Sequence, residues 1–385
     1  MPLPLFALML VVFSLTTGEF VIAGILPDVA SGLSVTVAAA GLLVTAYAVG
    51  MIVGGPVVTV MTARIHRRPL IMGLLLVSIV GNLGSAIAPD YVTLLLMRFV
   101  AGLVVATFFA VAISIAVSMA APGKQASSIA RVALGMNLGI ILGVPAGTFI
   151  GQHIDWRATF VAVASVTIAA TLLVRRYVPA PPAPTTGSAV SELRVFRNRN
   201  VQLAIALTAL GNVGVVMVFT YIAPLLTDVS GFSAGLIPIL LLVYGSGAVV
   251  GNFIGGWLSD RALMPSLISL LAVLAGALAL FWMVRDVQAA VVALTFIIGA
   301  LAFSIIPGMQ TRVISTASAA PTLAVAVNAS GFQVAAAFAG WMGGRVINSD
   351  LGLSAIYLTG AFLTLIGLTI AIYSHRRDRQ LTPAT

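Results

Sequence analysis

Residues 3–26 read LPLFALMLVVFSLTTGEFVIAGIL, an apolar run long enough to cross a lipid bilayer as a helix. The run contains one charged residue, Glu19. A carboxylate inside hydrocarbon is costly, so an acid in such a segment is by default a functional-site hypothesis. The alternative is a protonated Glu19 that only hydrogen-bonds across a helix interface. A lone acid within a membrane helix favours a proton or cation site in a transporter.

The composition points to a membrane protein throughout. Hydrophobic residues make up 60% of the 385 residues and charged residues 8%, whereas a soluble domain is about a quarter charged. The apolar segments are too many and too long for one buried core, which predicts an all-α polytopic membrane protein. Cysteine is absent and only three histidines occur. We therefore expect no disulfide, no metal site and no cofactor.

Twelve segments satisfy the length criterion of about 20 apolar residues for a membrane helix. They are residues 4–26, 38–61, 69–88, 91–119, 131–151, 158–177, 201–224, 235–258, 265–284, 289–309, 322–344 and 353–374. The long polar stretch after the sixth is rich in proline, small polar residues and arginine, and is predicted to be a linker. The predicted domains are an N-terminal six-helix half (1–177), a cytoplasmic linker (178–200) and a C-terminal six-helix half (201–385).

Lysine and arginine predict the orientation of these helices. With the N-terminus in the cytoplasm, 15 of the 19 Lys and Arg residues fall on the cytoplasmic side, three fall outside, and Arg98 lies within a span. This distribution predicts that both termini are cytoplasmic. It also accounts for the net charge of +9, because basic loops face anionic headgroups of the lipid bilayer. No nucleic-acid partner is needed to explain the charge.

The two halves repeat each other at an offset of 197 residues. The matching pairs are Pro27 and Pro224, Tyr47 and Tyr244, Gly50 and Gly247, Gly54 and Gly251, and Arg64 and Arg261. Each proline is expected to end an outward-running helix. Two parallel six-helix repeats, with a site near the midplane between them, are typical of a rocking transporter.

The fifth predicted helix has a glycine at every fourth position: Gly135, Gly139, Gly143, Gly147 and Gly151. This spacing predicts a stripe almost free of side chains, against which another helix can pack closely. Pro145 lies within the stripe and is expected to kink the helix and free a carbonyl. Helix packing alone explains the glycines but not the Gly-x-Pro-x-Gly arrangement.

This arrangement carries a resemblance to a known family. Gly139-x-x-x-Gly143-x-Pro145-x-Gly147 resembles the antiporter motif of the drug:proton antiporter branch of the major facilitator superfamily. Residues 94–102, LLLMRFVAG, which include Arg98, resemble the fourth-helix motif of the same superfamily. The resemblance implies the major facilitator fold over essentially the whole chain.

A cytoplasmic loop adds to the resemblance in the second half only. Residues 256–261, GWLSDR, resemble the superfamily's loop signature, which implies a conformational role for Asp260 and Arg261. The matching residues 63–68 of the first half, ARIHRR, have Ala63 in place of the usual aspartate and His66 in place of the usual glycine. The first half therefore keeps only the basic cluster of this signature.

Two further segments look like a bacterial subgroup of the family: residues 18–27, GEFVIAGILP, and residues 156–160, WRATF. That subgroup includes chloramphenicol exporters of actinobacteria, purine-nucleoside exporters and an exporter of arabinose products. The resemblance implies a location in a bacterial inner membrane. Because members share these segments while exporting different compounds, the segments do not identify a substrate.

The resemblance implies that Glu19 takes part in proton coupling and that Arg98 belongs to the proton relay. Elementary electrostatics is compatible with this role, because a carboxyl group in hydrocarbon is stabilised in its neutral form and can bind and release a proton. Its change of charge alters the cost of exposing the site to each side. Arg98 needs an acceptor, either Glu19 or backbone carbonyls and water. A purely structural bond to the backbone is the alternative.

Polar residues within predicted spans are candidates for substrate binding: Asn137, Asn212, Tyr221, Tyr244, Asn328 and Gln333. Hydrogen bonds to a neighbouring helix are an equally good interpretation of each. One intramembrane acid and one base favour a neutral or singly charged substrate over a polycation or an organic phosphate. No Gly-x-x-x-x-Gly-Lys motif for ATP and no nucleophile–base pair of an enzyme occurs in the sequence.

The sequence thus predicts a proton-coupled exporter of small neutral or weakly charged compounds, such as an antibiotic of the chloramphenicol type, that acts as a monomer. One alternative is a uniporter or importer of a sugar- or nucleoside-like solute, in which Glu19 binds substrate. A second is a non-transporting membrane sensor, which would need a large soluble domain or a long tail.

Overall fold

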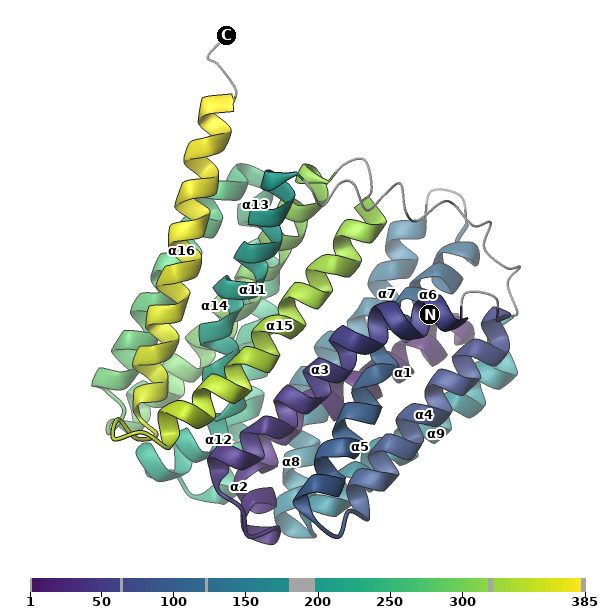
Figure 1. Cartoon of the computed structure of the whole chain (residues 1–385), viewed down its shortest axis with the longest axis horizontal. Coiled ribbons are helices and arrows are strands. Elements are labelled where there is room, and N and C mark those ends of the chain that lie inside the picture. The colour runs from purple at the N-terminus through teal and green to yellow at the C-terminus, as the bar shows by residue number, and fades with distance from the viewer. Residues whose placement is uncertain (1, 63–64, 122–123, 180–197, 318–320, 382–385) are drawn as a thin grey trace. The chain divides into compact units, whose positions relative to one another are not determined.

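The computed structural model describes the chain except for residues 1, 63–64, 122–123, 180–197, 318–320 and 382–385. The described residues form helices joined by short loops, and none of them forms a strand (Figure 1). The chain folds as two compact units. Unit 1 comprises Met1–Thr185 and Ser233–Leu241, and unit 2 comprises Thr186–Phe232 and Leu242–Thr385.

The helices before the linker are α1 (Leu3–Phe20), α2 (Ile22–Gly32), α3 (Val37–Thr62), α4 (Arg67–Ala86), α5 (Tyr91–Leu103), α6 (Val105–Ser118), α7 (Gln125–Leu138), the π turn η1 (Gly139–Gly143), α8 (Val144–His153) and α9 (Trp156–Tyr177). Those after it are α11 (Arg199–Thr220), α12 (Ile222–Pro224), η3 (Leu225–Val229), η4 (Ala234–Leu236), α13 (Ile237–Met283), α14 (Gln288–Thr316), α15 (Pro321–Ile347) and α16 (Ala355–Leu381).

The twelve predicted crossings are found within the described residues. Ten helical segments there are long and apolar enough to cross a membrane. One of them, Ala234–Met283, is 50 residues long and consists of two helices that meet at non-helical backbone at Ala262, so it supplies two crossings. The 27-residue α15 supplies the remaining one.

One expectation about the helix ends is wrong. Pro27 does not end the first helix, because α2 continues around it to Gly32, and the break lies earlier, at Val21. A proline removes a single backbone hydrogen bond, and membrane helices tolerate this when neighbouring groups satisfy the freed carbonyl. Its repeat mate Pro224 does end α12, and a π turn follows it.

The internal repeat is confirmed by the way helices pack in each unit. In unit 1, a Cβ added to any of three glycines would overlap a backbone carbonyl of the facing helix. The glycine and carbonyl pairs are Gly50 with Phe99, Gly54 with Leu103, and Gly102 with Tyr47. In unit 2 the same relation joins Gly247, Gly251 and Gly299 to the carbonyls of Phe296, Ala300 and Tyr244. Every one of these positions is displaced by the same 197 residues. The glycines allow the backbones of the paired helices to approach closely.

An ion pair joins α14 and α16 within unit 2. Arg312 Nη2 lies 2.7 Å from Asp378 Oδ2, and it also donates to Ser374 Oγ at 2.9 Å. The side chains are 10% and 29% exposed, so both charges are largely withdrawn from water. Losing the carboxylate would leave a nearly buried guanidinium without its counter-charge.

Asp378→Asn is therefore expected to destabilise unit 2 by about 1–2 kcal/mol, between the values for exposed and buried ion pairs. The apparent Tm of the purified protein in detergent measures this. Asp155→Asn is the matched control, because Asp155 and Arg157 are 4.0 Å apart and more exposed, and asparagine preserves the helix cap. Equal shifts in the two variants would show that the Arg312–Asp378 pair is not the stabilising contact.

Candidate functional site

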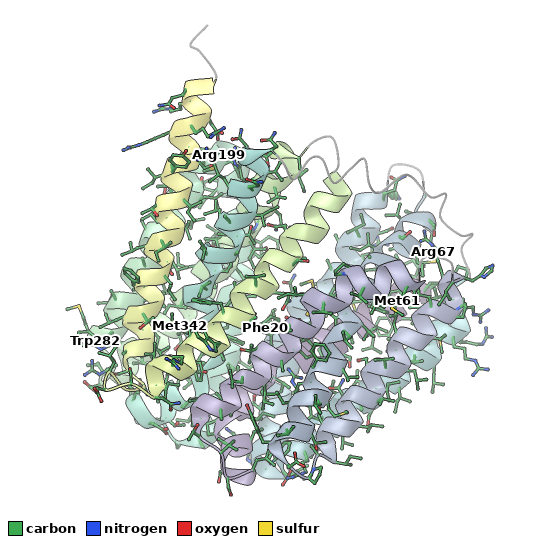
Figure 2. The ribbon with its side chains drawn as sticks, in the orientation of Figure 1. Phe20, Met61, Arg67, Arg199, Trp282 and Met342 are labelled. Atoms are coloured by element: carbon green, nitrogen blue, oxygen red, sulfur yellow. The ribbon has the colours of Figure 1, made fainter. Side chains whose placement is uncertain are left out.

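Glu19 lies in the last turn of α1, directly before the break in the first crossing helix. Val21 is the turn residue between α1 and α2, and Phe20 beside it is half-buried (Figure 2). The Val21 N–H donates to the Thr17 carbonyl at 2.9 Å, and the Gly24 N–H donates to the Val21 carbonyl at 3.0 Å, one residue closer than in an α-helix. The carboxylate is therefore carried at a local irregularity of the helix, and Glu19 is half-buried.

Arg98 on α5 binds this irregularity. Its side chain is fully buried. Nη1 donates to the Gly18 carbonyl at 2.6 Å and Nη2 donates to the Glu19 carbonyl at 3.1 Å. The sequence predicts that Arg98 needs an acceptor, either Glu19 or backbone carbonyls and water. These two distances show that backbone carbonyls accept its hydrogen bonds. The guanidinium thus clamps the last turn of α1 and brings its positive charge next to the residue that carries the acid.

Two aromatic rings complete the surroundings of Arg98. The guanidinium carbon lies 4.4 Å from the ring centroid of Tyr47 and 5.8 Å from that of Phe160. A cation above an aromatic face is stabilised by the ring quadrupole, and more so where water is excluded. From the sequence, Tyr47 is recognisable only as the repeat mate of Tyr244, because nothing in its local sequence indicates an arginine partner.

The charged pair is confined to unit 1. The position that matches Glu19 in the repeat is Val216, and the one that matches Arg98 is Thr295. Thr295 donates its hydroxyl to the Val291 carbonyl of its own helix at 2.8 Å. Tyr244, the mate of Tyr47, packs against Phe219 with ring centroids 4.9 Å apart. The repeated scaffold is therefore polar and charged in unit 1 and uncharged at the same positions in unit 2.

The glycine stripe packs on the helix that carries Glu19. A Cβ at Gly139 would approach the Phe13 carbonyl, one at Gly143 would overlap Thr17, and one at Gly147 would overlap Val21. The stripe also contains a π turn, in which the Val144 N–H donates to the Gly139 carbonyl five residues earlier. Pro145 follows this turn and is buried. π turns are rare and often mark functional sites.

The predicted substrate-binding residues separate into different environments. Asn212 donates to the Thr208 carbonyl at 2.7 Å and to the Met309 sulfur at 3.2 Å. The Thr208 hydroxyl is bonded to Asn328 Oδ1, so the structure brings Asn212 and Asn328 into one buried network in unit 2. Thr208 and Met309 were not predicted, because threonine and methionine within a membrane helix carry no distinguishing signal.

Tyr221, Gln333 and Asn137 are the remaining candidates. The Tyr221 hydroxyl donates to the Gly340 carbonyl at 2.7 Å, and Gly343 leaves room for its ring. Gln333 is buried on α15, and Asn137 is half-buried on α7. The hydrogen bonds of Asn212 and Tyr221 fit the alternative to substrate binding, in which these side chains bond to their own helix or to a neighbouring one. These bonds do not test whether the two residues also bind substrate.

The loop signature is partly described. Asp260 is exposed, and Arg261 lies over the exposed ring of Trp257, 3.8 Å from its centroid. Ala63 and Arg64, which match Asp260 and Arg261 in the first half, lie outside the described residues. Most of the predicted linker also lies outside them.

Beyond the spans, two carboxyls have altered acidity. Burial raises the pKa of Asp28, which lies on α2 nine residues after Glu19, and the nearby charge of Asp155 acts in the same direction. The Thr93 N–H donates to Asp90 at 2.8 Å and lowers the pKa of Asp90, which caps α5. Asp28 therefore binds a proton more readily than Asp90 at the same surface.

Arg98→Lys is expected to reduce transport at least tenfold, because a single ammonium cannot reach both carbonyls and stack on Tyr47. Transport rate normalised to protein in the membrane measures the effect. Arg157→Lys is the matched control, because Arg157 also binds a carbonyl, that of Ala88 at 3.1 Å, and stacks on Trp156 at 4.1 Å. Similar losses in both variants would mean that Arg98 acts only as a packing residue.

Comparisons with known proteins agree with this architecture. A family model described as Major Facilitator Superfamily matches residues 8–322. The uncharacterized MFS-type transporter YfhI of Bacillus subtilis is 34% identical over 376 residues, covering 98% of this chain and 95% of its own. The inner membrane transport protein YdhP of Escherichia coli is 34% identical, with 97% and 96% coverage. The chloramphenicol resistance protein of Streptomyces lividans is 34% identical over 380 residues, with 96% of each chain covered. Among solved structures, a bacterial homologue of the human lysosomal transporter Spinster superposes with a TM-score of 0.78 at 17% identity, covering 99% of this chain and 98% of that one.

Proposed function

Because the chain belongs to the major facilitator superfamily, we propose that it is a proton-coupled exporter of small neutral or weakly charged compounds. The observation that carries the proposal is the position of Glu19, an acid within the first crossing helix, at a break whose carbonyls are held by the buried Arg98. An intramembrane carboxyl next to a fixed positive charge is suited to bind and release protons as its surroundings change.

The contacts of Arg98 suggest how a proton would be sensed. When Glu19 is ionised, its charge attracts the guanidinium, and when it is neutral, only the two carbonyl bonds and the aromatic contacts hold Arg98. Since Arg98 is on α5 and the carbonyls are at the α1 break, protonation changes the force between these two elements. The glycine stripe of η1 and α8 packs on the same segment and would transmit its movement. A transporter needs such a difference in energy to bias its two accessible states.

The class of substrate follows from the charges and from one relative. The chloramphenicol resistance protein matches nearly the whole chain, and chloramphenicol is an uncharged antibiotic. Glu19 and Arg98 are the acid and the base well inside the predicted spans, and they leave little to balance a multiply charged solute. The buried amides and hydroxyls of Thr208, Asn212 and Asn328 are the polar groups we propose for recognition.

We further propose that the protein works as a monomer in a bacterial inner membrane with both termini in the cytoplasm, driven by the proton gradient without a bound cofactor. The relative YdhP is an inner membrane transport protein, and the Lys and Arg distribution supports the orientation.

The experiment that tests the function is expression in a host that lacks its own exporters, followed by a resistance screen against uncharged antibiotics and nucleosides. We expect resistance to at least one compound, with a lower cell content that rises when an uncoupler collapses the proton gradient. A cell content that increases on expression would instead favour an importer. A content that only equilibrates, with or without the gradient, would favour a uniporter.

A further inference from the structure

One end of unit 1 carries a concentration of positive charge, and within the part of unit 1 that the structure describes no acid lies beside it. The N-terminus of α4 supplies Arg67 and Arg68, with Arg67 labelled in Figure 2, and the C-terminus of α9 supplies Arg175 and Arg176. Residues 1–185 contain four acids, namely Glu19, Asp28, Asp90 and Asp155.

None of these acids lies at the basic end. Asp90 follows the far end of α4 and Asp155 precedes the far end of α9. The two helices have 20 and 22 residues, which places both acids about 30 Å away. This exceeds the Debye length of about 8 Å at physiological salt, so these acids do not neutralise the arginines.

The arginines are held together by contacts with the ends of the helices. Arg68 Nη2 donates to the Arg175 carbonyl at 2.8 Å, which joins the start of α4 to the last turn of α9. Arg67 donates to the hydroxyl of Ser114 on α6. Arg176 lies 5.3 Å from the ring centroid of Tyr177. Arg68, Arg175 and Arg176 are nonetheless exposed. A guanidinium has five N–H donors, so the one bond of Arg68 leaves most of its capacity for an anion.

The surface next to these arginines is apolar. The exposed side chains along the two helices are Leu76 and Val80 on α4 and Ile168 and Leu172 on α9, which are 60%, 51%, 41% and 61% exposed. They recur at four-residue spacing, so each helix presents one apolar stripe. Tyr177, which is 38% exposed, is the last residue of α9, and aromatic side chains at such helix ends mark the membrane interface.

We infer that the arginines at the joined ends of α4 and α9 bind the phosphate of an anionic phospholipid, such as phosphatidylglycerol or cardiolipin, whose acyl chains lie along the apolar stripes. Charge complementarity selects an anion, and arginine matches phosphate geometry with paired N–H donors. The adjoining apolar stripes select a lipid over a soluble anion. Lipid binding at this surface does not depend on the proposed substrate.

Lipid binding to the purified full chain in detergent tests the inference. Native mass spectrometry with phosphatidylglycerol is expected to show retained lipid, with weaker retention of phosphatidylcholine. Arg68→Gln combined with Arg175→Gln is expected to weaken phosphatidylglycerol binding roughly thirtyfold, and Arg176→Gln alone, which removes no hydrogen bond to the backbone, about fivefold. Arg285→Gln is the matched control, because Arg285, which follows α13 in unit 2, also donates to a backbone carbonyl and lies over an aromatic ring, those of Trp282.

Three results would overturn the inference. Equal retention of the two lipids by the unaltered protein would remove the charge selectivity. An equal loss in Arg285→Gln would show a general effect of net charge. Displacement of phosphatidylglycerol by millimolar inorganic phosphate would indicate a soluble-anion site instead. If the double variant does not fold, the result for Arg176→Gln decides, because no loss of lipid in that variant contradicts the site.

Discussion

Glu19→Gln is expected to abolish export against a concentration gradient while the amount of protein in the membrane stays largely unchanged. Glutamine keeps the size and polarity of the side chain but cannot bind and release a proton, so the energy of the gradient is no longer coupled to the movement of substrate. The Gly18 and Glu19 carbonyls that hold Arg98 are backbone groups and persist in the variant. We expect accumulation in inverted membrane vesicles to fall to the level of passive equilibration.

Asp90→Asn is the matched control for this prediction. Asp90 is exposed and caps α5, and asparagine caps helices equally well, so export should be nearly unchanged. Glu19→Asp retains a titratable carboxyl and should keep measurable coupling. If Glu19→Gln still concentrates substrate against a gradient, Glu19 is not the coupling site.

Gly143→Leu is expected to cause a comparable loss of transport for a different reason. Even a single Cβ at this position would overlap the Thr17 side chain on α1, two residues before Glu19. A leucine must push α1 away from η1 and α8, and overpacking of this kind costs about 1–3 kcal/mol or more. Transport normalised to folded protein, measured by size-exclusion chromatography in detergent, separates the effect on function from the effect on folding.

Gly73→Leu provides the control, because no atom lies within 4 Å of a Cβ built at Gly73 and the position is exposed. A milder pair sharpens the test. Gly143→Ala should reduce transport severalfold, and Thr17→Ala in the same chain should restore part of it, since it removes the Oγ1 and Cγ2 atoms that the alanine meets. Equal losses at positions 73 and 143, or no rescue by Thr17→Ala, would contradict the packing argument.

The helices of this fold are predictable because the bilayer imposes a local rule. A span of about 20 apolar residues is visible in the sequence without knowledge of its neighbours. The repeat is equally visible, because Gly50 packs against the Phe99 carbonyl just as Gly247 packs against the Phe296 carbonyl, and a larger residue does not fit where backbones touch. The break at Val21 is not predictable, since no glycine or proline occupies that position, whereas Pro27, which the sequence marks as a helix end, lies inside α2.

The candidate site was predictable only in part. Glu19 and Arg98 can be identified because charged residues are rare within membrane spans. A charged residue inside an apolar run is visible in the sequence without knowledge of the structure. Their arrangement depends on the rotation and depth of α5 against α1, which no local pattern encodes. The clamp of Arg98 on two carbonyls, the contact of Gly143 with Thr17, and the network of Asn212 and Asn328 through Thr208 therefore required the packed helices.

The most direct test of proton-coupled export is the direction in which protons move when substrate alone supplies the driving force. Proteoliposomes containing the protein and a pH-sensitive dye are loaded with the compound to which it confers the strongest resistance, and are then diluted into compound-free buffer of the same pH. The account predicts that outward flow of the compound drives protons inward, so the lumen becomes more acidic, and that Glu19→Gln vesicles show no pH change. A lumen that stays at constant pH while the compound leaves, or one that becomes more alkaline, would contradict antiport and point to a uniporter or a symporter.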